Sequence, residues 1–372
     1  MNDFTPIKFV DTDAQSIEQE LITAYQLKTG QALYPGDPRR IFLMQILPVL
    51  VAIRNDINYT GNANLLPFAY GEVLDALGDR FDVGRLQSEP SKVNMMFELS
   101  IINLNPVMIP KGTRVTPDGE IYFATTTALT INAGETNGTV TAVSTVGGAK
   151  NNGFLPGQIN LLVDPISYVA SVRNIDISSG GSDEETDDAY RDRQRLAPAS
   201  FSVAGPKDAY VFFAKSADVD IIDVEVITPA PCEVEIYPLM KGGTLPGADT
   251  LQQVMNEVSG ATRRPLTDRV KVLAPTVVDY SIDLTYYISA DRSYEEAVIR
   301  SDVEGVGGAA DQYEVWQRSK LGRAITPDDL IARIYRAGAY RVVTISPQYT
   351  EITDSQVAKR IGVRKLTYGG LI

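Results

Sequence analysis

Five carboxylates lie within six consecutive residues of this chain, at Asp183, Glu184, Glu185, Asp187 and Asp188. Such a cluster could hold a cation. The spacing, however, lacks the alternating ligands and the central glycine of a calcium loop. Carboxylates also favour the first turns of a helix, where they meet the positive end of the helix dipole. We therefore predict a solvated helix start here, capped by Ser182 or Asp183, rather than a metal site.

The chain has 372 residues and no histidine. This excludes Ser-His-Asp triads, Cys-His dyads and HExxH zinc sites. The lone Cys232 cannot form an internal disulfide, and without a histidine partner we predict an inert thiol, packed or partly exposed. Carboxylate pairs for glycoside hydrolysis stay possible among 47 acidic residues, but a single tryptophan disfavours the aromatic platform of a sugar site.

Glycine pairs occur at residues 147–148, 180–181, 242–243 and 307–308. None fits GxxxxGK[ST] or GxGxxG between a strand and a helix, so we interpret them as turns. The sequence thus predicts no cofactor, no metal ion and no small-molecule substrate.

The cluster most like a motif surrounds Pro265, with Arg263, Arg264 and Arg269 beside Asp268. Guanidinium groups pair carboxylates with two parallel hydrogen bonds. We expect either a structural ion-pair network or a contact between subunits.

Composition is typical of a folded, water-soluble chain, with 44% hydrophobic and 22% charged residues. The length suits two to four domains. A net charge of −13 disfavours a nucleic-acid groove, so no nucleic-acid partner is expected. The longest apolar run, residues 41–53, is interrupted by Gln45 and Pro48 and falls short of the roughly 20 residues that span a bilayer. We expect no membrane insertion and no export signal.

Residues 1–88 have the pattern of a helical segment. Helices are predicted over residues 13–27, 39–61 and 70–80. Asp13 or Ser16 should cap the first, Pro48 should kink or split the second, and Leu74 and Leu77 should lie in the core of the third. This segment either packs on its own chain or joins helices of other chains, since broad apolar surfaces need burial somewhere.

The remaining sequence predicts a multidomain α+β protein. Short β-type runs between Gly, Pro and Asn favour a β-barrel or β-sandwich at residues 89–177, with residues 105–119 as a turn. Two small α+β domains follow at 178–274 and 275–372. Helices are expected from the acid cluster to about residue 196, and at 206–217, 248–260, 294–303 and 326–337. Strands are expected at 219–228, 233–240, 275–288, 340–346, 356–363 and 365–372, with another after residue 268.

Two runs, LAPASFSVAGPKDAY at 196–210 and RPLTDRVKVLAPTVVDYSI at 264–282, resemble the baseplate J-like family of contractile tails. IPKGTRV followed by YFATT belongs to the same resemblance, as does the PLTD turn at Pro265, Leu266, Thr267 and Asp268, which we interpret as fixing the entry to a strand. The resemblance implies a structural protein and no enzyme. It also implies two copies in each wedge, a smaller partner clasped by N-terminal helices, and six wedges around a spike hub.

The resemblance further implies a place in the virion tail baseplate after assembly in the host cytoplasm, with itself and other wedge and hub proteins as partners. The ring would hold the sheath and relay the trigger for its contraction. Alternative functions are a tail-associated glycosidase and a glycan-binding adhesin. Our candidate interface residues are Ile17, Leu21, Tyr25, Ile46, Ile53, Leu74, Arg263, Arg264 and Asp268.

Overall fold

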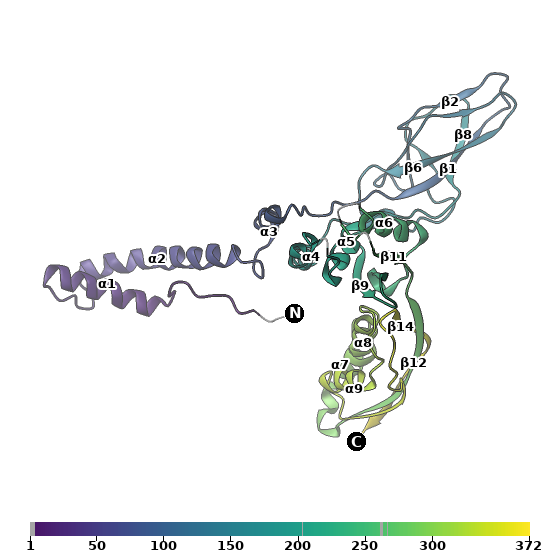
Figure 1. The fold of residues 1–372 in the computed structure, drawn as a ribbon. Coiled ribbons are helices and arrows are strands. Elements are labelled where there is room, and N and C mark those ends of the chain that lie inside the picture. The colour runs from purple at the N-terminus through teal and green to yellow at the C-terminus, as the bar shows by residue number, and fades with distance from the viewer. Residues whose placement is uncertain (1–3, 203, 261–262, 266) are drawn as a thin grey trace. The chain divides into compact units, whose positions relative to one another are not determined.

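The computed structural model describes residues 4–202, 204–260, 263–265 and 267–372 (Figure 1). The chain divides into two compact units. The first comprises Met1–Arg85 with Thr186–Arg195, and the second comprises Leu86–Glu185 with Leu196–Ile372. The mixed α+β fold, with a helical N-terminal segment, a barrel-like sheet and smaller sheets, confirms the predicted fold class. The division into four domains stays a prediction.

The first unit begins with α1 (Ala14–Thr29), α2 (Pro38–Ala63), α3 (Gly71–Gly78) and the 3-10 turn η1 (Asp79–Phe81). Asp13 caps α1, accepting the N–H of Ser16 at 2.8 Å. Helix α2 is continuous through Pro48, so the expected split is absent. Pro48 is exposed, so the backbone carbonyl one turn earlier, which lacks an N–H partner, can accept a hydrogen bond from water.

Helices α1 and α2 form a hairpin, and they lie side by side (Figure 1). The segment before α1 is held along α2 by two asparagines one turn apart. Asn58 Oδ1 accepts the backbone N–H groups of Phe9 at 2.8 Å and Val10 at 3.0 Å, and Asn62 Oδ1 accepts that of Ile7 at 2.8 Å. The same two amides donate back to the carbonyls of Val10 and Ile7. These two polar side chains of α2 are thus used inside the unit.

The second unit begins with a barrel-like antiparallel sheet in the strand order β7-β3-β4-β6-β1-β8. Its strands are β1 (Lys92–Leu99), β3 (Arg114–Thr116), β4 (Phe123–Thr125), β6 (Asn137–Ser144), β7 (Leu161–Leu162) and β8 (Val169–Asn174). Strands β2 (Val107–Ile109) and β5 (Leu129–Ile131) pair separately, and η2 (Ala149–Asn151) follows β6. Alternate residues of β1 are buried, including Met95 and Phe97, which contribute to the barrel core. Residues 105–119, expected as a turn, contain two short strands.

Two helices of the next layer pack together beside a three-stranded sheet in the order β11-β10-β9. The elements are α4 (Asp187–Ser200), α5 (Lys207–Ala217), β9 (Ile221–Ile227), β10 (Glu233–Met240), η3 (Lys241–Gly243), α6 (Ala248–Val258) and β11 (Arg269–Val272). Helix α4 was expected to stop near Leu196 but runs through Pro198. Pro198 lies in the last turn and is exposed, so the missing N–H interrupts little of the helix.

The C-terminal layer has a second three-stranded sheet, in the order β13-β12-β14. Its elements are β12 (Thr276–Ile288), η4 (Ala290–Glu295), α7 (Glu296–Glu304), α8 (Ala309–Gln317), α9 (Pro327–Arg336), β13 (Arg341–Ser346) and β14 (Gln356–Leu371). Alternate residues of β12 face a core that α7, α8 and α9 complete.

Two predictions for this layer were wrong. Helix α8 was not expected. The two predicted strands at 356–363 and 365–372 form one strand, β14. Asp279 accepts the N–H groups of Ile361 at 2.7 Å and Gly362 at 3.0 Å, so the irregularity there is a bulge that keeps the strand paired.

Candidate assembly surfaces

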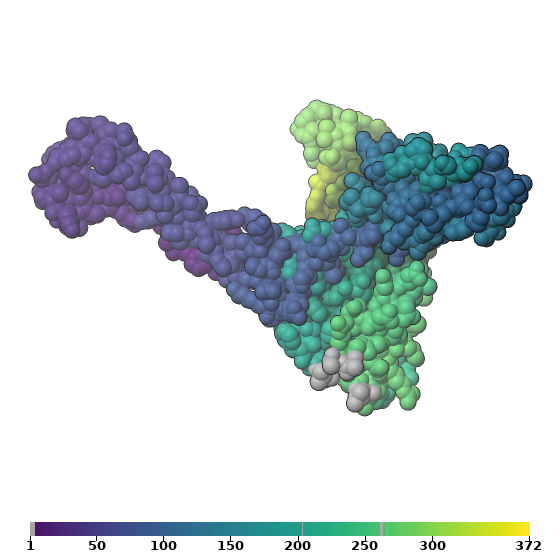
Figure 2. Space-filling model, turned by 90° about the horizontal axis from the view of Figure 1, so that it is seen from above, coloured from purple at the N-terminus to yellow at the C-terminus, as the bar shows by residue number. Residues whose placement is uncertain are grey.

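An exposed apolar face of the first unit belongs to α2. Phe42, Val49, Ile53 and Ile57 follow one another at intervals of seven, four and four residues, which places them on one side of the helix. Each is between 45% and 62% exposed. Figure 2 shows α1 and α2 as one closely packed purple body. A surface groove of about 390 Å³ lies on this helix, lined by Ile53, Asp56, Ile57, Thr60, Gly61 and Asn64. Contiguous apolar surface of this kind is typical of an interaction site.

The structure places the six apolar candidates in three groups. Ile17 and Leu74 are buried within their own unit and offer no surface to a partner. Leu21, Tyr25 and Ile46 are half-buried, and Arg39 lies over the ring of Tyr25 at 5.9 Å. Ile53 is exposed in the α2 groove. An interface on this hairpin is therefore best represented by Ile53 and its neighbours on the same face.

Helix α2 also bears on the prediction that the chain has no membrane-spanning segment. It has 26 residues. An 18-residue window within it has a mean hydropathy of 1.3, and no residue of that window is buried. By length and composition alone such a helix could cross a bilayer, which the interruptions at Gln45 and Pro48 had argued against. The helices of a soluble assembly pass the same test, so a single helix does not establish a span.

A polar network ties α4 to the segment around α3 inside the first unit. The Arg85 guanidinium pairs with Asp75 at 2.8 Å and with Asp187 at 2.7 Å, and it lies 4.8 Å from the ring centroid of Tyr190. Asp187 also accepts the N–H of Gly71 at 3.0 Å. The Gly71 hydrogen bond, together with Arg85, lowers the pKa of Asp187 below its usual value.

Only part of the acid cluster is the helix start that we expected, because Asp187 and Asp188 alone lie in the first turn of α4. Helix α4 begins at Asp187, after Asp183, Glu184 and Glu185. Asp183 accepts the N–H of Ala149 at 2.9 Å, and the buried Glu185 accepts that of Leu86 at 3.0 Å. Those two carboxylates therefore fasten a loop of the second unit. In the described part of the chain no group of three or more metal-binding side chains is close enough to hold an ion.

The Arg263 side chain makes local contacts. It forms an ion pair with Glu257, donates to the Glu257 carbonyl at 2.8 Å, and lies 5.1 Å from the ring centroid of Phe213. Both members of the ion pair are more than a third exposed, so the pair contributes little to stability. It joins α6 to the loop that follows.

The PLTD turn is anchored by Asp268, which accepts the Tyr210 hydroxyl at 2.6 Å. Arg264 donates to the Asp268 carbonyl. Burial and this hydrogen bond raise the pKa of Tyr210. A methyl group at Gly205 would meet Pro265 at 2.9 Å and Asp268 at 3.0 Å, and its φ is +72°. Leu266 lies outside the described residues. The contacts agree with a turn that holds the entry to β11.

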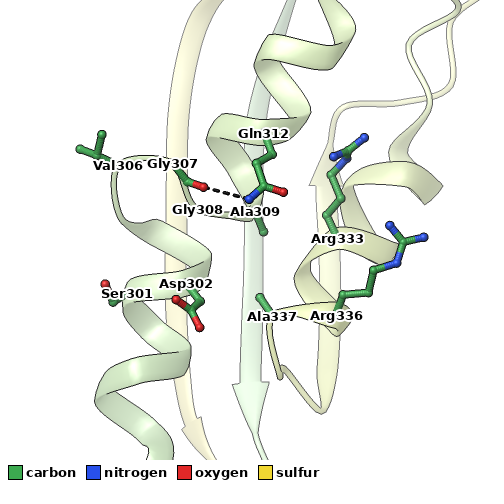
Figure 3. A pocket seen from close by; sticks show the side chains of 10 residues that line it. All are labelled: Ser301, Asp302, Val306, Gly307, Gly308, Ala309, Gln312, Arg333, Arg336 and Ala337. Atoms are coloured by element: carbon green, nitrogen blue, oxygen red, sulfur yellow. Dashed lines mark hydrogen bonds between the residues drawn. The ribbon is translucent and has the colours of Figure 1, made fainter. Parts of the chain in front are cut away.

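A small cavity of about 340 Å³ lies between α7, α8 and α9 in the C-terminal layer (Figure 3). Arg333 and Arg336 line one side, and Gln312 donates to the Gly307 carbonyl at 2.9 Å. Ser301 and Asp302 line the other side, and no hydrogen bond joins their side chains among the described residues. The cavity therefore has two guanidinium groups on one side and a hydroxyl and a carboxylate on the other.

The comparisons with known proteins agree with this layout. Residues 98–181 match the baseplate J-like protein barrel domain, and residues 202–274 match the baseplate J-like central domain. Baseplate protein J of Escherichia phage P2 is 30% identical over 189 residues. This chain carries two baseplate J-like domains. The alignment covers 50% of this baseplate J-like chain and 60% of the phage P2 protein, so the chain spans less than two thirds of that relative.

One solved structure is similar over most of the baseplate J-like chain. It is a component of the six-fold symmetrised cryo-EM structure of the anti-feeding prophage baseplate. The likeness covers 93% of this chain and 89% of that chain, with 15% sequence identity and a TM-score of 0.46.

The sequence did not reveal the network that joins α4 to α3. Asp187 was noticed only as one of five neighbouring acids, and its partners Gly71 and Arg85 are more than a hundred residues earlier. No spacing rule connects residues so far apart. The sequence held one hint of this network. Arg85 and Tyr190 are residue types that often contact each other, because a guanidinium group stacks on an aromatic ring.

Proposed function

We propose that this chain is a structural part of the baseplate wedge of a contractile tail, and that the α1–α2 hairpin packs against helices of other wedge chains. The two baseplate J-like domains and the similarity to baseplate protein J of phage P2 support a structural role in the virion tail baseplate. The chain then acts through its surfaces and carries out no reaction.

The observation that carries the proposal is the apolar face of α2, where Phe42, Val49, Ile53 and Ile57 are about half exposed in the described structure. The spacing of these side chains suits a groove between two other helices. About half of each side chain is available, and its burial against a partner would stabilise a complex through the hydrophobic effect.

Helices of partner chains suit this face better than lipid does. Arg40 pairs with Glu18 at 2.9 Å, and Arg54 pairs with Glu20 at 2.6 Å. These ion pairs join α1 to α2 along the hairpin. In a bilayer four charged side chains would have to enter hydrocarbon, which costs several kcal/mol. A protein bundle can leave the same pairs at its polar rim.

Within this proposal two copies of the chain associate in each wedge and clasp a smaller partner with their hairpins. Six wedges close a ring around the central hub, hold the sheath, and relay the trigger for its contraction. Repeated heterologous contacts close such a ring when the rotation between neighbours fits. Assembly in the host cytoplasm needs no disulfide, which agrees with the single exposed Cys232.

A direct test isolates the tagged chain from cells that produce the particle and images the eluate by negative-stain electron microscopy. We expect wedge-shaped or sixfold ring complexes with other tail proteins. A lone chain would contradict the proposal. In that case the purified chain would be assayed on peptidoglycan and on glycan arrays, which test the glycosidase and adhesin alternatives.

A further inference from the structure

An acidic cleft of about 520 Å³ lies in the second unit, where the start of β1 and the end of the β8–α4 loop meet the ends of α5 and α6. Its charged lining consists of Glu89, Asp218, Asp220, Asp249 and Lys92. Four carboxylates thus share the cleft with one ammonium group. None of these five side chains forms an ion pair within the described part of the chain.

The two central carboxylates are half-buried. Asp218 follows α5 and accepts the N–H of Asp220 at 2.9 Å, while Asp220 precedes β9. Burial raises the pKa of both. At Asp218 the hydrogen bond from the Asp220 N–H opposes this shift and the Glu89 charge adds to it. At Asp220 the charges of Asp218 and Asp183 add to the shift and that of Lys241 opposes it. The fold thus holds more negative than positive charge in the cleft.

Ser182 supplies an independent observation that points to a ligand. It lines the cleft and is only 5% exposed, yet its Oγ has no hydrogen-bond partner among the described residues. Its backbone is fixed, because the main chains of Ser182 and Glu89 exchange hydrogen bonds of 3.0 and 3.1 Å. A buried hydroxyl without a partner is unfavourable, and a donor that enters the cleft would satisfy it.

We propose that this cleft binds the guanidinium group of an arginine side chain carried by a partner protein. Guanidinium offers five N–H donors, is weakly hydrated, and pairs well with half-buried carboxylates. The carboxylates are spread along an open cleft and do not converge on a point, as a metal ion would require, and the described residues hold no metal-binding group. This site consists of residues of the second unit only, so either proposal can fail alone.

A sugar is a poorer match for the cleft. Carboxyl groups with raised pKa values are also found in glycosidases. The described lining, however, contains no aromatic side chain on which a sugar ring could stack. The cleft also carries three more negative charges than positive charges, since four carboxylates oppose Lys92. An organic cation fits this charge.

The test titrates N-acetyl-arginine amide into the full chain by calorimetry, with N-acetyl-citrulline amide as a neutral ligand of the same shape. We expect saturable binding at one site for the arginine compound only. The Asp218→Asn/Asp220→Asn variant should bind about tenfold more weakly. Ser182→Ala should bind a few-fold more weakly. Asp328→Asn, which removes an exposed carboxylate from α9, should bind as the natural chain does.

Stability gives a second readout that separates loss of binding from loss of folding. Without ligand, Asp218→Asn should unfold at a higher temperature than the natural chain, because a half-buried charge is removed while the amide oxygen can still accept the Asp220 N–H. The proposal would be overturned if no saturable binding were seen, if the citrulline compound bound equally well, or if the double variant bound as tightly as the natural chain. Displacement of the arginine compound by stoichiometric CaCl₂ would also overturn it.

Discussion

The hydroxyl of Tyr190 donates a hydrogen bond of 2.5 Å to the backbone carbonyl of Val83, 107 residues earlier in the chain. Both residues are buried. The bond fastens the first turns of α4 to the segment after α3, and Gln194 adds a second bond to the Leu74 carbonyl at 3.0 Å. The region that follows the helical hairpin therefore owes its structure to residues from two distant parts of the sequence.

Tyr190→Phe should weaken this connection. It leaves the Val83 carbonyl buried without its partner, which costs about 1–2 kcal/mol. Amide hydrogen exchange in α3 and in the first half of α4 should accelerate roughly tenfold, while exchange in the β12–β14 sheet should not change. Unchanged protection of α3 would show that the hydrogen bond contributes nothing to this unit.

Gly78→Ala should destabilise the same place for a steric reason. A methyl group at Gly78 would lie 2.0 Å from the Tyr190 hydroxyl oxygen and 2.6 Å from the Val83 carbonyl oxygen. We expect a loss of about 2 kcal/mol in the natural chain. The loss should be smaller in a Tyr190→Phe background, because the nearest atom is then gone. Equal losses in the two backgrounds would show that the hydroxyl is not the obstacle.

Asp187 should make the stability of the first unit depend on pH. Its pKa in the folded chain lies below the unfolded value, so its contribution is complete above the unfolded pKa of about 4 and is lost as the pH falls through the lower folded value. At pH 7, Asp187→Asn should cost roughly 1 kcal/mol, allowing for solvent exposure. Exchange of the Gly71 amide, compared at pH 7 and pH 3, should show this difference shrinking in acid.

Asp268 should be replaceable by asparagine but not by alanine. The asparagine oxygen can still accept the Tyr210 hydroxyl, whereas alanine leaves that buried hydroxyl without a partner. We expect Asp268→Ala to cost about 1–2 kcal/mol and Asp268→Asn less than half of that. The shifts in thermal unfolding midpoint of the two variants, relative to the natural chain, measure these losses. Equal shifts would contradict the anchoring role of Asp268 in the PLTD turn.

The sequence predicted those elements whose patterns are local. The period of the apolar residues indicated α1 and α2, Asp13 marked a cap, and alternation indicated β1 and β12. Helix α8 was missed because its buried face includes the small residues Ala309 and Ala310 after a Gly-rich stretch that has the pattern of a turn.

The candidate site was predicted less completely than the fold. Ile53 stays a predicted interface residue on an exposed face, whereas Ile17 and Leu74 are buried. An apolar position on a helix does not reveal whether its own chain or another covers it. The acidic cleft was beyond sequence reasoning, because Ser182 and Asp218 come from separate elements that only the fold brings together.

The central claim is that the exposed face of α2 joins other wedge chains. Ile53→Glu/Ile57→Glu in the full chain tests it most directly, with Leu104→Glu, a 90% exposed apolar site outside the hairpin, as the control. The measurement is the fraction of tagged chain recovered in wedge or ring complexes from cells producing the particle. We predict near-complete loss for the double variant, normal recovery for the control, and unchanged thermal unfolding for both. Normal recovery with the double variant would contradict the account.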